Sequence, residues 1–170
     1  MKILIVAHLN DEILYFDPQW FDKIYVCFSD MRSERANKRI SKLMAGYPLR
    51  MELLGLKETD TLRDNYDYLI RKLKGIVEKD IEFWTHNPWG EYGNTEHILV
   101  HQAVLEIAER FQIGVWGFNG ITKIEGQEEY PKKLDIDFLE RVYQLYKKHH
   151  LWKERINFRP KHWQNYYKLL

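Results

Sequence analysis

The sequence predicts an α/β fold: a single Rossmann-like domain with a mostly parallel sheet and helices on both faces. Short apolar runs alternate with longer segments of helical periodicity, as expected of repeated strand–helix–strand units. Most of the short runs are almost continuously apolar, which is typical of strands covered on both faces. The 170 residues suffice for one domain with a substantial core. We therefore interpret 1–170 as one domain, with a core over 1–120 and a C-terminal helix and aromatic arm over 121–170.

The individual elements follow from these patterns. The apolar runs predict strands at 2–7, 23–29, 50–56, 80–86 and 114–119. The periodic segments predict helices at 32–45, 61–78, 95–111 and 135–149. In the helix at 95–111 the buried face is expected to contain Leu99, Val100, Ala103, Val104 and Ile107. The tail "HHLWKERINFRPKHWQNYYKLL" is expected to pack on the body as an irregular arm.

Composition excludes several classes of function. Hydrophobic residues make up 45% and the formal net charge is +1, so we expect a globular chain with no electrostatic attraction to nucleic acid or to a membrane surface. The single cysteine, Cys27, lies in an apolar run and is interpreted as a core residue of a cytoplasmic protein. No G-x-G-x-x-G motif follows the first strand, which disfavours a dinucleotide site.

Polar residues gather where two predicted strands end. In "IVAHLNDEIL" the first strand is followed by His8, Asn10, Asp11 and Glu12, and the fourth strand is followed by "HNPWGEYGNTEH". Ligands in open α/β sheets bind at the carboxyl ends of the strands. His8, Asp11 and His97 would form a set of nitrogen and oxygen donors suited to Zn²⁺ or another divalent metal. Taken from the residues alone, hydrogen-bonded structural histidines are the more common interpretation of such a pattern.

The two motifs together resemble a known family. "AHLNDEIL" is similar to the His-Pro-Asp-Asp-Glu signature of the LmbE/PIG-L family of zinc-dependent N-acetyl-sugar deacetylases, and "HNPWGEYGNTEH" is similar to its second signature, which ends in His-Pro-Asp-His. The resemblance covers residues 1 to about 120. It implies a Rossmann-like fold, metal ligands at His8, Asp11 and His97, and hydrolysis of an N-acetylated sugar or glycoconjugate.

The resemblance also places two asparagines at proton-handling positions. The general base that activates water in the family falls on Asn10, and the histidine that assists at the substrate carbonyl falls on Asn94. An amide neither accepts nor releases a proton near neutral pH, and positioned acid–base groups contribute about 10²–10⁴-fold to rate. Both asparagines also suit helix N-caps. The sequence thus favours a metal-dependent deacetylase, with a catalytically impaired member serving as a sugar-binding or assembly module as the alternative.

Other residues complete the predicted site. Glu12 is a candidate proton relay, as are Glu91, Glu96 and His101. The resemblance places substrate-holding arginines after the second strand, at Arg32 and Arg35, and Trp89 offers a stacking platform for a sugar or a core or lid residue. The predicted partners are a small-molecule or glycan substrate and neither nucleic acid nor membrane, with oligomerisation left open.

Overall fold

The computed structural model describes residues 1–29, 35, 51–119, 129–148 and 163–170. These residues form a seven-stranded sheet of order β3-β2-β1-β4-β5-β7-β6. The first five strands of that order run parallel to their neighbours, and β7 is antiparallel to both β5 and β6. The strands are β1 (Lys2–Val6), β2 (Lys23–Phe28), β3 (Met51–Leu56), β4 (Glu82–Thr85), β5 (Gly114–Asn119), β6 (Glu129–Lys133) and β7 (Trp163–Lys168).

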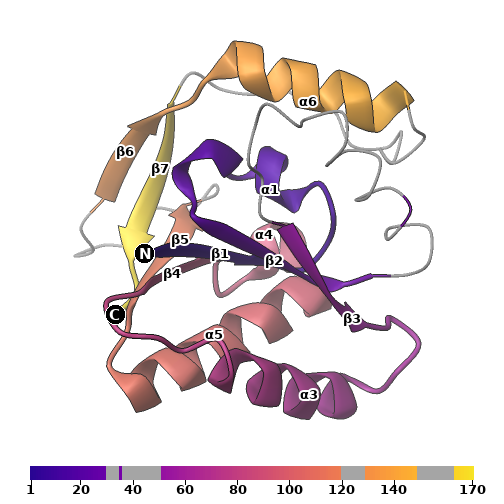
Figure 1. Cartoon of the computed structure of the whole chain (residues 1–170), viewed down its shortest axis with the longest axis vertical. Helices are drawn as coiled ribbons and strands as arrows, with labels where there is room; N and C mark the ends of the chain where they lie inside the picture. The colour runs from indigo at the N-terminus through magenta and orange to yellow at the C-terminus, as the bar shows by residue number, and fades with distance from the viewer. Residues whose placement is uncertain (30–34, 36–50, 120–128, 149–162) are drawn as a thin grey trace.

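Helices cover both faces of this sheet, as Figure 1 shows. On one face lie α3 (Leu62–Lys74) and α5 (Thr95–Phe111), and on the other lie α1 (Asp11–Leu14) and α6 (Ile136–Lys148). A 3₁₀ turn at Pro18–Trp20 and the short α4 (Gly90–Gly93) complete the described elements. Each face has its own apolar cluster, and β1, buried at four of five positions, contributes side chains to both. The predicted fold class, with a mostly parallel sheet between helices, is confirmed.

The chain order of the strands determines where a site can form. From β1 the chain adds β2 and β3 on one side, then crosses to build β4 and β5 on the other. The direction of winding therefore reverses between β1 and β4, which pair in parallel. At such a reversal the loops leave the carboxyl ends of adjacent strands in opposite directions and open a crevice. The loops of that crevice are those that follow Val6 and Thr85.

Most predicted elements are present, and the tail is the main correction. The strand and helix predictions over 1–29, 51–119 and 129–148 are confirmed to within a few residues, including the five buried positions of α5. The helix predicted at 32–45 lies outside the described residues apart from Arg35. The irregular arm is wrong for 163–168, because this segment pairs with the open edge of β5 and forms strand β7. Its apolar pattern is weak, and the edge of β5 supplies the hydrogen bonds that make it a strand.

Among the described residues, no helix combines the length and the apolar character that crossing a membrane requires.

Candidate functional site

The loop after β1 is shaped by its own backbone. Asn10 adopts a left-handed conformation (φ 96°, ψ −15°) and precedes α1, a region that asparagine tolerates better than most residues. This turn lets the Asp11 carboxylate accept a hydrogen bond from the backbone N–H of His8, with 2.7 Å between the atoms. The side chains of His8 and Asp11 are thereby brought to the same side of the turn.

The loop after β4 ends at the N-terminus of α5. The side chain of Asn94 accepts hydrogen bonds from the backbone N–H groups of Glu96 and His97, at 2.9 and 3.3 Å. This is an N-cap, and the cap interpretation of Asn94 is confirmed. The capped first turn places His97, which is fully buried, against the end of the sheet.

Three side chains from these loops converge. The Nδ1 atom of His8, Oδ2 of Asp11 and Nε2 of His97 are separated from one another by 3.3 to 3.6 Å. Donor atoms of a tetrahedral zinc ion, each about 2.0–2.1 Å from the metal, lie about 3.3–3.4 Å apart. The donor set and its spacing therefore fit a tetrahedral divalent ion. The side chain of His8 is 19% exposed, whereas Asp11 and His97 are buried, so the cluster has one face open to solvent.

A second group of possible ligands shares His97. It consists of His86, Glu91 and His97, with Glu91 Oε2 lying 2.6 Å from His97 Nδ1 and 3.1 Å from His86 Nδ1. A separation of 2.6 Å is a hydrogen bond and is too short for two ligands of one metal. All three side chains are almost fully buried, which leaves no face for a substrate. This group is therefore a hydrogen-bonded layer behind the first cluster.

His86 ends β4 at the base of the site. Its Nε2 accepts the backbone N–H of Ala7 at 2.9 Å, which places the ring proton on Nδ1. The ring stacks on that of His97 with centroids 3.9 Å apart. Its Nδ1 is close to Glu91 but is not aligned as a hydrogen bond. His101, one turn along α5, is buried and hydrogen-bonded through Nδ1 to the carbonyl oxygen of His86 at 2.7 Å.

Electrostatics favour the metal-binding forms of two members of the first cluster, Asp11 and His97. Burial opposes ionisation of Asp11, but the close side chains of His8, His86 and His97 outweigh burial and hold the pKa of Asp11 well below its usual range. Burial likewise opposes ionisation of Glu91, and the nearby His86 lowers its pKa to about 2. Burial lowers the pKa of His97. Carboxylates and neutral imidazoles are the forms that bind metals.

The remaining predicted residues of the first loop have mainly structural contacts. The side chain of Asn10 makes no capping hydrogen bond to α1, so the prediction that it caps this helix is wrong. Its left-handed backbone turns the side chain away from the geometry that a cap needs. Glu12 is buried and accepts hydrogen bonds from the Tyr146 hydroxyl and, at 2.8 Å, from the Asn10 backbone N–H. Burial raises the pKa of Glu12 to about 7.

Two tyrosine rings contact His97. Trp89 is 47% exposed and Tyr92 is 68% exposed, and the Tyr92 ring lies 5.5 Å from that of His97. Tyr15 packs edge-on against His97 at 6.0 Å. Arg35 is exposed, with no contact to the cluster in the described part of the chain, and Arg32 lies outside the described residues. Sequence reasoning gave no role to Tyr92 or His86, although both lie inside the motif that follows β4.

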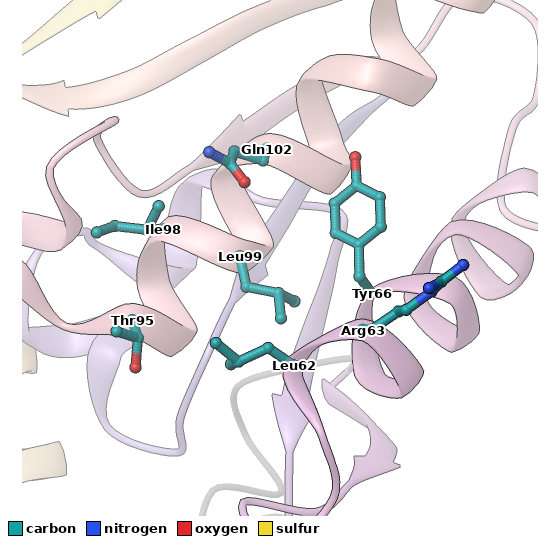
Figure 2. A pocket seen from close by; sticks show the side chains of 7 residues that line it. All are labelled: Leu62, Arg63, Tyr66, Thr95, Ile98, Leu99 and Gln102. Atoms are coloured by element: carbon teal, nitrogen blue, oxygen red, sulfur yellow. The ribbon is translucent and has the colours of Figure 1, made fainter.

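A separate cavity lies between α3 and α5 (Figure 2). It has a volume of about 330 Å³. Thr95 and Ile98 reach it from the first turn of α5, whereas His97 of the same turn points to the sheet. None of its lining residues belongs to the cluster, so it is distinct from the candidate site. The lining residues are Leu62, Arg63, Tyr66, Thr95, Ile98, Leu99 and Gln102.

Comparisons with known proteins identify the fold. The sequence matches no family model and no curated protein. Among solved structures, the chain is similar to the A40926 pseudoaglycone deacetylase Dbv21, with a TM-score of 0.65, 12% identity and coverage of 98% of this chain and 95% of the other. It is also similar to the zinc-inhibited form of the teicoplanin deacetylase Orf2, with a TM-score of 0.66, 9% identity and coverage of 99% and 97%. These structural neighbours are deacetylases, and this chain shares their fold.

Proposed function

We propose that the protein is a metal-dependent amide hydrolase of the LmbE/PIG-L type that removes the acetyl group from an N-acetylated sugar or glycoconjugate. The observation that carries the proposal is the spacing of 3.3 to 3.6 Å among the donor atoms of His8, Asp11 and His97. Their position at the crevice between β1 and β4 supports it, and so does the fold shared with deacetylases.

In this proposal His8 Nδ1, Asp11 Oδ2 and His97 Nε2 hold one divalent ion, which we assign as zinc. Such an ion supplies Lewis-acid polarisation of an amide carbonyl and lowers the pKa of water. The partly exposed side of His8 leaves room for the substrate. Tyr92, exposed and with its ring 5.5 Å from that of His97, offers a ring face against which a sugar can stack, and the exposed Trp89 remains a proposed stacking residue.

The two asparagines limit the rate in this proposal. Asn94 already uses its side-chain oxygen to cap α5, so only its amide N–H₂ is left to donate a hydrogen bond to a carbonyl oxygen. Asn10 can orient a water molecule but cannot take its proton. Both oxygens of Glu12 are engaged by Tyr146 and Asn10, so we assign Glu12 to holding the loop. Arg32 and Arg35 remain proposed substrate contacts from the resemblance alone.

The second candidate function is a catalytically impaired member that binds sugar or supports an assembly. The cap at Asn94 favours this candidate, because capping of α5 is enough to explain an asparagine at position 94 without any catalytic role. Turnover distinguishes the two candidates: a working deacetylase releases acetate from an N-acetylated sugar, and a binding module does not.

The test of the proposal begins with zinc. Metal-free protein titrated with Zn²⁺ in a calorimeter is expected to bind one ion, and His97→Ala is expected to abolish that binding because one of three ligands is lost. Gln102→Ala, an exposed position on the same helix, is the matched control and is expected to bind as the wild type does. Acetate release from N-acetyl hexosamines by the zinc-loaded protein then measures activity. Equal zinc binding by wild type and His97→Ala would overturn the site assignment.

A further inference from the structure

We propose that Glu91 is a positioning residue that fixes the ring of His97 so that its Nε2 lone pair faces His8 and Asp11. The inference rests on the proposed function only for the identity of the bound ion. It also predicts which ring nitrogen of His97 carries the proton, and this can be measured in the metal-free protein. Glu91 is absent from the predicted ligand set, and nothing in the resemblance assigns it this role.

The hydrogen bond between Glu91 and His97 carries the argument. Glu91 Oε2 lies 2.6 Å from His97 Nδ1, and an ionised carboxylate can only accept a hydrogen bond. The ring proton of His97 must therefore reside on Nδ1. In the neutral ring this leaves the lone pair on Nε2, the atom that lies 3.3 Å from His8 Nδ1 and 3.4 Å from Asp11 Oδ2. Carboxylates that hold ligating histidines in this way are common behind metal sites.

Asn87 holds Glu91 in place through hydrogen bonds to both its side chain and its backbone. The other oxygen of Glu91, Oε1, accepts the backbone N–H of Asn87 at 3.0 Å, and the side chain of Asn87 accepts the backbone N–H of Glu91 at 2.8 Å. The Glu91 side chain is only 4% exposed. The group that orients His97 is therefore rigid and shielded from water, which strengthens its hydrogen bonds.

His86 supports the same arrangement from behind. The Ala7 backbone N–H donates to Nε2 of His86, so the ring proton of His86 resides on Nδ1, which lies 3.1 Å from Glu91 Oε2 without the alignment of a hydrogen bond. Oε2 of Glu91 thus lies close to the Nδ1 atoms of two stacked rings and is hydrogen-bonded to that of His97. The His86 ring also packs against one face of the His97 ring, with centroids 3.9 Å apart and planes 20° apart.

The backbone of Glu91 is strained in this position. Its φ of 60° and ψ of −55° lie in a region that glycine adopts readily and residues with a side chain rarely adopt. Strain of this kind persists where the surrounding structure enforces it, often at functional sites. Here the strained turn is what brings the side chain of residue 91 back beneath His97, six positions later in the chain.

The test separates the carboxylate from the backbone. In metal-free wild type, ¹⁵N NMR of the histidine rings is expected to show His97 as the Nδ1–H tautomer. Glu91→Gly relieves the backbone and removes the carboxylate, so His97 is expected to populate both tautomers. The affinity of the Glu91→Gly variant for Zn²⁺, measured by calorimetry, is expected to be about 10- to 100-fold lower than that of the wild type. Glu91→Gln, which keeps the length of the side chain, has one acceptor oxygen where the carboxylate accepts from both His97 Nδ1 and the Asn87 backbone N–H, so it is also expected to lose affinity for Zn²⁺.

Glu109→Gln is the control, since it removes an exposed carboxylate from α5, the helix that carries His97. It is expected to leave both the tautomer and the zinc affinity unchanged. The proposal is overturned if wild-type His97 carries its proton on Nε2, or if Glu91→Gly and Glu91→Gln keep wild-type affinity. If the wild type binds no zinc, the proposed function fails, and the tautomer comparison between wild type and Glu91→Gly still decides the role of Glu91.

Discussion

At the scale of the residue, two asparagines occupy similar places for different reasons. Asn10 suits its positive φ of 96° better than most residues would, and it gives α1 no side-chain cap. Asn94 has an extended backbone and caps α5 with its side-chain oxygen. Aspartate also tolerates a left-handed backbone, so the fold accepts a carboxylate at position 10. Histidine at position 94 can restore a proton-handling group only by giving up the cap.

This difference gives a prediction for the two substitutions. Asn10→Asp is expected to keep the stability of the wild type, whereas Asn94→His should lower the free energy of unfolding by about 1 kcal/mol through loss of the cap. The double variant is expected to deacetylate N-acetyl hexosamines at least about 10²-fold faster than the wild type, because both proton-handling positions are restored. Thermal unfolding and acetate release measure the two effects. A wild type that is already fast and is slowed by both changes would contradict our description of these positions.

At the scale of the element, the short helix α1 is joined to α6 through a buried hydrogen bond. The Tyr146 hydroxyl donates to Glu12, and both residues are almost completely buried. Glu12 also accepts the backbone N–H of Asn10 at 2.8 Å. A helix from the C-terminal part of the chain therefore stabilises the loop that carries His8 and Asp11.

Tyr146→Phe tests this connection. Removing the hydroxyl leaves a buried carboxylate oxygen short of one donor, which is expected to cost about 1–3 kcal/mol of unfolding free energy. Tyr66→Phe is the control, because its hydroxyl donates to Glu106 at the surface and its loss should cost about 0.5 kcal/mol or less. Urea unfolding of both variants measures the difference. Equal stability of the two variants would show that the bond between α1 and α6 contributes nothing.

At the scale of the whole molecule, β7 ties the end of the chain to the first half of the sheet. Tyr166 is fully buried, stacks on Phe16 at 5.6 Å and packs edge-on against Trp84 at 5.2 Å. Its hydroxyl donates to the carbonyl oxygen of Tyr15 at 2.8 Å. The strand thus supports the chain just after α1 and also β4, whose continuation carries His86.

Tyr166→Ala is expected to lower the free energy of unfolding by about 3–5 kcal/mol, as other large aromatic truncations in cores do. Lys168→Ala, at an exposed position of the same strand, should change it by about 0.5 kcal/mol or less. Denaturant unfolding followed by tryptophan fluorescence compares the two. If Tyr166→Ala lowers the free energy of unfolding no more than Lys168→Ala does, β7 contributes nothing to the stability of the core.

Much of the fold was predictable because its signals are local. β1 and β2 are short apolar runs, and α5 repeats its buried positions at helical spacing. The strands β6 and β7 were not predicted, since neither "EYPKK" nor "WQNYYK" has a strong apolar pattern of its own. Their hydrogen bonds come from β5 and from each other, over long distances along the chain.

The sequence by itself determined that His8, Asp11 and His97 would meet, because parallel strands bring their carboxyl ends to one edge and the strand pattern is local. Only the tertiary structure decided what lies behind them. It stacked His86 on His97 and placed Glu91, at a residue of positive φ, close to both rings. It also paired Glu12 with the hydroxyl of Tyr146 from α6. Ligand residues follow from strand ends, whereas the groups that orient them depend on rotamers, backbone strain and contacts between distant segments, which no local pattern encodes.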